Sequence, residues 1–295
     1  MSLGLQVVLN GLQAGAVYVL FAVGLTLIFG VMKIVNFAHG ELFTGAAYIT
    51  FLVVDTGVKE TGLPVWLLYL IALVVAVAVT GLAGFFMYEV LFKRFAGDLI
   101  AGLLIAVGLS LILQVVYRLL FTSTSRRVPQ LINGTVTIAG ASLTIERLVI
   151  LVAAVVVTVA LAAFLRNTRL GISLRAVSED REAAQLQGIN YRRVARSGFM
   201  LGAVLAGVAA VLIAPVTVVN PSMGIDLLMK GFIIVILGGL GSIPGAIIAG
   251  LLLGLLESAA STFINVTAAT VFSFVVVIAV LLIRPQGLLG RIERA

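Results

Sequence analysis

Residues 148–165 read LVILVAAVVVTVALAAFL. Thr158 is the one polar residue of this stretch, and no residue in it is charged. A helix needs about 20 apolar residues to cross the hydrocarbon core of a bilayer, whereas a membrane-spanning strand is shorter and alternates apolar with polar residues. The stretch therefore predicts a transmembrane α-helix.

The composition extends this prediction to the whole chain. Hydrophobic residues make up 62% of the 295 positions, charged residues only 11%, and the mean hydropathy is +1.25. Soluble proteins carry about 25% charged residues, so too few polar groups remain here to cover a surface in water. We predict an all-α, polytopic transmembrane bundle of about eight or nine helices, forming a single domain over residues 1–295. The predicted spans are 5–30, 37–54, 64–88, 99–121, 148–165, 194–219, 227–240, 245–262 and 268–283.

Two of these spans are weaker than the others. The second begins with polar residues, and the seventh is short and ends in glycine. Either could be a broken helix rather than a full span. Glycine is abundant, with 31 copies, and small residues let helix backbones approach closely within a membrane.

Lysine and arginine are distributed unevenly about these spans. If all nine segments cross and the N-terminus lies outside, thirteen of the 19 lysines and arginines fall on the cytoplasmic side. The positive-inside rule favours this arrangement, with the C-terminus inside. It also accounts for the net charge of +7 without nucleic acid as a partner. The basic residues that fall outside are Lys59, Arg118, Arg126, Arg127 and Arg147, and Lys230 lies near the start of a helix.

Two long loops flank the stretch at 148–165. Residues 122–147 fall outside, and their alternation around Gly134 predicts a small periplasmic β-hairpin. Residues 166–196 fall in the cytoplasm, because their seven arginines would cost roughly 20 kcal/mol in the bilayer at about 3 kcal/mol each. Within this second loop, residues 178–187 predict a short helix that Ser178 caps and Gly188 ends.

Several kinds of chemistry lack the residues that they need. The chain has no cysteine and one histidine, His39, which excludes thiolate and multi-histidine metal sites, and no cofactor is expected. No Gly-Lys dipeptide occurs, so there is no P-loop for ATP, and we do not expect an enzyme. Gly239 and Gly241 join two apolar segments, which argues against a dinucleotide fingerprint and favours a helix-breaking turn.

Four short motifs resemble those of one family. Glu182-Ala183-Ala184-x-x-x-Gly188 resembles the EAA loop of bacterial ABC-importer permeases, which forms the coupling helix that docks onto the ATPase subunit. Residues 30–41, GVMKIVNFAHGE, resemble the hallmark between the first two helices of LivH-type permeases of the branched-chain amino acid ABC importer family. Residues 238–246, GGLGSIPGA, and 284–288, RPQGL, resemble later motifs of that family in the same order.

The resemblance implies a permease of the bacterial inner membrane that moves leucine, isoleucine and valine across the lipid bilayer. It also implies partners: two ABC ATPase subunits, a second homologous permease subunit and a periplasmic substrate-binding protein. Coupling to the ATPase is then expected at Glu182, Ala183, Ala184 and Gly188.

A few residues of the spans are candidates for the pathway or a gate, because ionisable groups in membrane segments are costly and usually functional. The sequence places His39 and Glu41 at the cytoplasmic entrance to the second span. They could instead satisfy backbone groups freed by a break at Gly40. Glu257 must find a partner or stay protonated. The full candidate set is Asn36, His39, Glu41, Gly239, Gly241 and Glu257.

Three other functions share part of this pattern. A permease of the same family for urea or short amides would carry every motif above. A secondary carrier would need coupling-ion ligands and often inverted repeats, and no clear internal repeat is visible in the sequence. An intramembrane serine protease would need a nucleophile motif to accompany His39, and none is recognisable.

Overall fold

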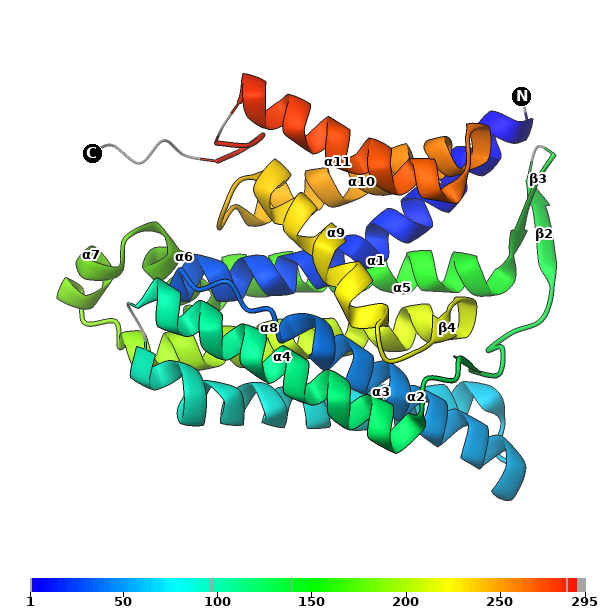
Figure 1. Cartoon of the computed structure of the whole chain (residues 1–295), viewed down its shortest axis with the longest axis horizontal. Helices are drawn as coiled ribbons and strands as arrows, with labels where there is room; N and C mark the ends of the chain where they lie inside the picture. Colours follow the sequence, from blue (N-terminus) through cyan, green and yellow to red (C-terminus); the bar gives the residue numbers. More distant parts are fainter. Residues whose placement is uncertain (1, 96–97, 139, 285, 291–295) are drawn as a thin grey trace.

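The computed structural model describes residues 2–95, 98–138, 140–284 and 286–290, and it shows a helical bundle (Figure 1). Within these ranges seven helical segments are long and apolar enough to cross a membrane, which confirms the predicted polytopic fold. They are built on α1 (Ser2–Met32), α2 (His39–Glu60), α3 (Val65–Phe86), α4 (Leu99–Phe121), α5 (Ile145–Asn167), α8 (Tyr191–Ile213) and α10 (Ile243–Phe263). After α3 the chain continues through a π-helical turn, η1 (Met87–Leu91), and a 3-10 turn, η2 (Phe92–Phe95).

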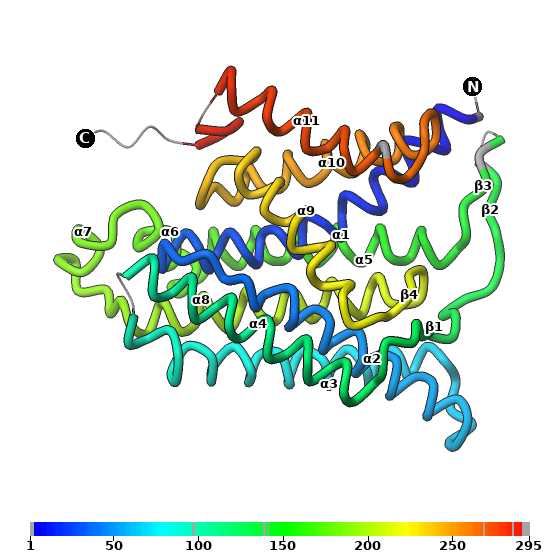
Figure 2. Tube along the Cα trace, in the orientation of Figure 1, coloured from blue at the N-terminus to red at the C-terminus, as the bar shows by residue number. Residues whose placement is uncertain are grey.

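Two further apolar helices are shorter. α9 (Met223–Gly238) has 16 residues, and at 1.5 Å per residue its length of about 24 Å is less than the ~30 Å hydrocarbon core. α11 (Val266–Ile283) packs against α10 at the edge of the bundle (Figure 2). The seventh predicted segment is therefore short, as its sequence indicated, whereas the second forms the 22-residue helix α2.

The sixth predicted segment, 194–219, extends too far. α8 ends at Ile213 and is followed by a 3-10 turn, η3 (Ala214–Val216), because Pro215 has no N–H to continue the helix. The chain then forms a short strand, β4 (Val218–Val219). The apolar residues after the proline misled the prediction because their hydrophobicity alone does not distinguish helix from strand.

The predicted hairpin is confirmed. β2 (Thr135–Ile138) pairs antiparallel with β3 (Ala141–Thr144). Ser142 N donates a hydrogen bond to Gln6 Oε1 at 2.9 Å, which ties the hairpin to the start of α1. A second ladder, which the sequence did not indicate, pairs β1 (Arg126–Arg127) with β4.

The two ends of the bundle differ in chemistry. The arginine-rich helices α6 (Arg169–Glu179) and α7 (Arg181–Leu186) lie at one end (Figures 1 and 2). The β2–β3 hairpin and the start of α1 lie at the opposite end. Between them α1 forms the buried centre, with α8 and α10 packed along it. The apolar helices thus separate a basic end from a hairpin end.

Candidate translocation and coupling sites

The chain enters the bundle before α2 begins. After α1 ends at Met32, residues 33–36 are not helical. Asn36 then starts α2: its backbone O accepts a hydrogen bond from His39 N at 3.2 Å, and its Oδ1 accepts one from Ala38 N at 3.1 Å. These bonds satisfy N–H groups that a helix start leaves free, in a place where water cannot do so.

His39 lies deeper than its sequence position suggested. Its Nε2 donates to Phe21 O at 3.2 Å, and Phe21 precedes the end of α1 by about three helical turns, roughly 16 Å. The His39 side chain is 0% exposed. The prediction that His39 and Glu41 lie at the entrance to the second span was wrong, because the chain turns into the bundle before the helix starts.

Glu41 links α2 to α4. Its Oε1 accepts a hydrogen bond from Ser110 Oγ at 3.2 Å, and Ser110 Oγ accepts one from Gln114 Nε2 at 3.1 Å. Tyr117 OH donates to Glu41 O at 2.9 Å. The carboxyl, hydroxyl and amide are all buried. This network gives α4 polar contacts with the bundle where lipid offers no hydrophobic drive.

Three buried polar atoms near these residues remain unused. Within the described part of the chain, Asn36 Nδ2, His39 Nδ1 and Glu41 Oε2 have no hydrogen-bond partner. Leaving a buried polar group unpaired costs about 1–3 kcal/mol. Each of these three atoms can therefore form one further hydrogen bond.

A second break repeats the first. Asn220 Oδ1 accepts a hydrogen bond from Ser222 N at 3.0 Å, as the Asn36 amide does before α2. The sequence shows the same pattern in both places: VNFAHG at 35–40 and VNPSMG at 219–224. α9 therefore begins within the bundle as α2 does (Figure 1).

The two broken helix pairs, α1–α2 and α8–α9, meet through reciprocal glycine contacts. Gly40 packs on the carbonyl of Gly224, and Gly224 packs on the carbonyl of Gly40. Gly24 and Gly202 face each other's carbonyl oxygens in the same way. Small residues allow this close approach of helix backbones within a membrane. The paired VN…G motifs, which mark the start of α2 and the start of α9, were not singled out from the sequence.

Glu257 is held by residues of two other helices. Lys230 Nζ of α9 donates to Glu257 Oε1, and Tyr18 OH of α1 donates to Glu257 Oε2 at 2.7 Å. Lys230 Nζ also donates to Tyr18 OH at 2.8 Å. Glu257 has a partner, as its position in an apolar span required. The sequence did not identify Lys230 as that partner, because an ion pair between two different helices has no fixed spacing in the sequence.

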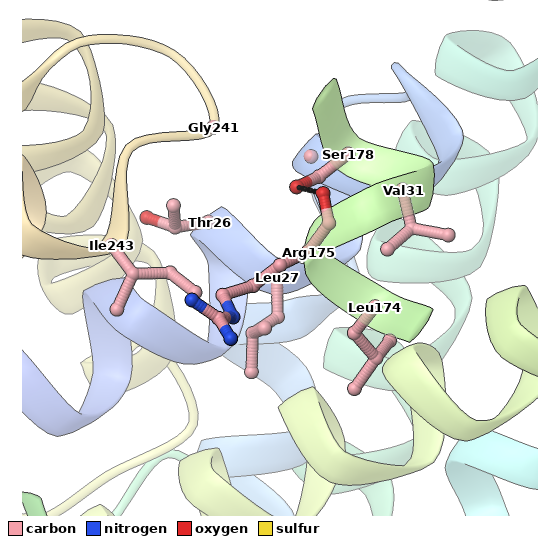
Figure 3. A pocket seen from close by; sticks show the side chains of 9 residues that line it. Thr26, Leu27, Val31, Leu174, Arg175, Ser178, Gly241 and Ile243 are labelled. Atoms are coloured by element: carbon pink, nitrogen blue, oxygen red, sulfur yellow. Dashed lines mark hydrogen bonds between the residues drawn. The ribbon is translucent and has the colours of Figure 1, made fainter. Parts of the chain in front are cut away.

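Gly239 and Gly241 form the predicted helix-breaking turn, away from His39 and Glu41. Their φ angles are +102° and +81°, in the region that only glycine adopts readily. Gly241 lines a small pocket together with Arg175 and Ser178 of α6 (Figure 3). The turn between α9 and α10 therefore lies next to α6.

The predicted helix at 178–187 is divided in two. α6 ends at Glu179 and α7 begins at Arg181. Asp180, and not Ser178, caps α7: its Oδ1 accepts a hydrogen bond from Ala183 N at 2.9 Å. Ser178 Oγ instead donates to the backbone of α6. An ionised carboxylate at this position also interacts favourably with the positive end of the helix dipole.

α7 presents part of the predicted coupling set to its surroundings. Glu182, Ala183 and Gly188 are exposed, whereas Ala184 is 5% exposed and packs inward. Gly188 ends the helix with a φ of +83°, as predicted. Leu186, which the sequence did not single out, is 87% exposed. Leu186 lies beside the exposed residues of the predicted coupling set on α7.

Comparisons with known proteins agree with this arrangement. Residues 7–282 match the family described as branched-chain amino acid transport system / permease component. The chain is 37% identical over 300 residues to the high-affinity branched-chain amino acid transport system permease protein LivH of Escherichia coli, covering 98% of this chain and 96% of the relative. It is 35% identical to the corresponding permease protein BraD of Pseudomonas aeruginosa, with the same coverage. No solved structure matches the chain.

A third relative extends the similarity to an archaeon. The probable branched-chain amino acid transport permease protein LivH of Methanocaldococcus jannaschii is 29% identical over 304 residues, covering 98% of this chain and 93% of the relative. Full-length similarity to permeases, together with seven long apolar helices, makes the chain a multi-pass inner-membrane protein. The chain belongs to the permease-component family of branched-chain amino acid transport systems.

Proposed function

We propose that the chain is the permease subunit of an ATP-driven importer for leucine, isoleucine and valine. The observation that carries the proposal is its full-length similarity to permeases named for these substrates. The bundle also suits the cargo, because an aliphatic side chain needs a passage lined mostly by apolar and small residues. Selectivity then belongs to a periplasmic binding protein that delivers the amino acid.

Two ATPase subunits dock on α7 of this chain and of a second, homologous permease. Energy must come from such a subunit because the sequence has no P-loop of its own. Glu182 offers a charge, Leu186 an apolar anchor and Ala183 a small surface for close approach. The exposed part of α7 carries all three kinds of contact at the basic end of the bundle.

Movement of α7 can be passed to the membrane-spanning helices through α6, which contacts them directly. A Cβ on Gly30 of α1 would lie 3.3 Å from Ser178 of α6 and 3.6 Å from Gly241. A shift of α6 therefore meets α1 and the α9–α10 turn directly. Gly239 and Gly241 provide the hinge at which α9 moves relative to α10.

Asn36, His39 and Glu41 form the gate in this proposal. Their side chains lie where α2 and α9 begin, and each has one unused polar atom within the described chain. A second conformation that gave these atoms partners would recover part of the energy that they cost here. Alternating access requires two states of similar stability.

The basic end of the bundle is cytoplasmic, and the hairpin end is periplasmic. Because the chain has no cysteine, single Gln187→Cys and Ser142→Cys variants test this cleanly. In cells whose outer membrane has been permeabilised, a membrane-impermeant maleimide is expected to label the Ser142→Cys variant and spare Gln187→Cys. The reverse labelling would overturn the orientation.

Purification of the tagged chain in mild detergent tests the proposed complex. We expect a P-loop ATPase and a second permease of this family to co-purify, with two ATPase subunits for each permease pair. The readout is mass spectrometry for identity and light scattering for stoichiometry. A chain that purifies without an ATPase and still carries leucine in liposomes would be a secondary carrier.

A further inference from the structure

Lys230, Glu257 and Tyr18 form a charged cluster in the interior of the membrane, referred to below as the Lys–Glu–Tyr cluster. Each residue comes from a different helix, and each side chain bonds to the other two. Tyr18 lies near the midpoint of α1 (Ser2–Met32). The cluster therefore lies near the middle of the bilayer, where transporters bind substrates.

The cluster is open on one side. The side chains of Lys230 and Glu257 are 27% and 17% exposed, whereas Glu41, which serves as an internal link, is 1% exposed. Asp226, one turn before Lys230 on the same face of α9, is also exposed. A charge at the bilayer centre costs about 2.5–3.5 kcal/mol or more against lipid. This face of α9 must therefore meet water or protein.

We propose that the Lys–Glu–Tyr cluster is a binding station for the zwitterionic head group of an α-amino acid in the translocation passage. The substrate carboxylate takes the place of Glu257 beside Lys230, and the substrate ammonium takes the place of Lys230 beside Glu257. Tyr18 OH can donate to either carboxylate. This inference rests on the proposed function, since it assigns a station to the cargo of that importer.

Replacing the internal ion pair by the two substrate contacts changes the free energy of the site little. Breaking a buried ion pair by removing one partner is strongly unfavourable, since it leaves an unpaired charge. A zwitterion inserted between Lys230 and Glu257 gives each charge a new partner at once, and the total charge of the site stays the same. Binding is therefore weak and reversible, which a passage needs because its cargo must also leave.

Replacing Lys230 and Glu257 by neutral residues distinguishes substrate binding by this pair from a purely structural role. A buried ion pair can often be replaced by neutral residues of similar size without loss of stability. We therefore expect the K230M/E257Q double variant to assemble normally in the complete importer. Its initial rate of leucine uptake in proteoliposomes should fall on the order of tenfold or more, because the head group would have to shed its water without a partner.

The matched control is the exposed ion pair between Lys59 and Asp55 on α2, whose atoms lie 2.7 Å apart. The K59M/D55N variant should take up leucine at the wild-type rate. Leucine uptake by K230M/E257Q at the wild-type rate would overturn the station, and so would failure of that variant to assemble, since the pair would then be a structural tie. Absence of uptake by the wild-type importer would instead count against the proposed function.

A labelling experiment detects occupancy directly. Met229 precedes Lys230 in α9 and is 38% exposed, and Leu104, in the separate helix α4, is 65% exposed. In the working importer a water-soluble maleimide should label the Met229→Cys variant and spare Leu104→Cys. Leucine should slow that labelling, and the K230M/E257Q changes should abolish the protection. The proposal would be overturned if leucine did not change the rate at which Met229→Cys is labelled, or if Met229→Cys were not labelled at all.

Discussion

The Gly224→Val substitution is expected to destabilise the folded permease strongly and to lower its yield from the membrane. Gly224 packs directly on the carbonyl of Gly40 and on Thr44 Oγ1 at the point where α2 and α9 begin. An added side chain would overlap backbone, which no change of rotamer relieves. We expect a cost of roughly 3 kcal/mol or more, a large part of the 5–15 kcal/mol that typically stabilises a protein.

Size-exclusion chromatography of the detergent extract and thermal unfolding measure this effect. Gly108 of α4 is the matched control, because a Cβ there would have no neighbour within 4 Å. The Gly108→Val variant should elute and unfold like the wild type. Equal yield and stability of the two variants would show that α2 and α9 do not meet as described.

Variants of α7 are expected to abolish transport while the bundle stays intact. We propose that Leu186 and Glu182 contact the ATPase. Leu186→Asp removes the apolar side chain of this contact, and Glu182→Lys reverses its charge. Gly188→Val forces a β-branched side chain into a backbone with a φ of +83°, at a cost of about 1–2 kcal/mol. All three changes lie outside the apolar spans that drive membrane insertion.

The expected results are wild-type amounts of permease in the membrane, loss of leucine uptake, and loss of the ATPase on purification of the Leu186→Asp variant. Val136→Asp is the control, since Val136 is also an exposed apolar residue but lies in the hairpin at the opposite end. It should retain the ATPase. Normal uptake by all three α7 variants would mean that α7 is only a connection between α6 and α8.

The spans could be predicted from the sequence because the signal for each is local. Residues 99–121 form α4 with the predicted bounds, since a run of apolar residues needs no partner to reveal it. Gly188 was likewise predictable, because a glycine after a short capped helix has a defined backbone role.

Features that depend on the packing of distant segments were missed. The depth of His39 follows from its contact with Phe21, which lies in another helix. The Lys230–Glu257 pair joins two helices that hydrophobicity alone does not bring together. Ala184 and Leu186 differ in exposure because α7 turns one face toward the bundle, and a six-residue helix is too short to show that face by periodicity.

Uptake by proteoliposomes that hold the complete importer tests the central claim most directly. The assay supplies radiolabelled leucine and the binding protein on one side of the membrane, and ATP or a non-hydrolysable analogue on the ATPase side. We expect leucine to accumulate against its gradient only with hydrolysable ATP, with competition from isoleucine and valine and none from urea. Accumulation driven by a sodium or proton gradient without ATP, or a preference for urea over leucine, would contradict the assignment.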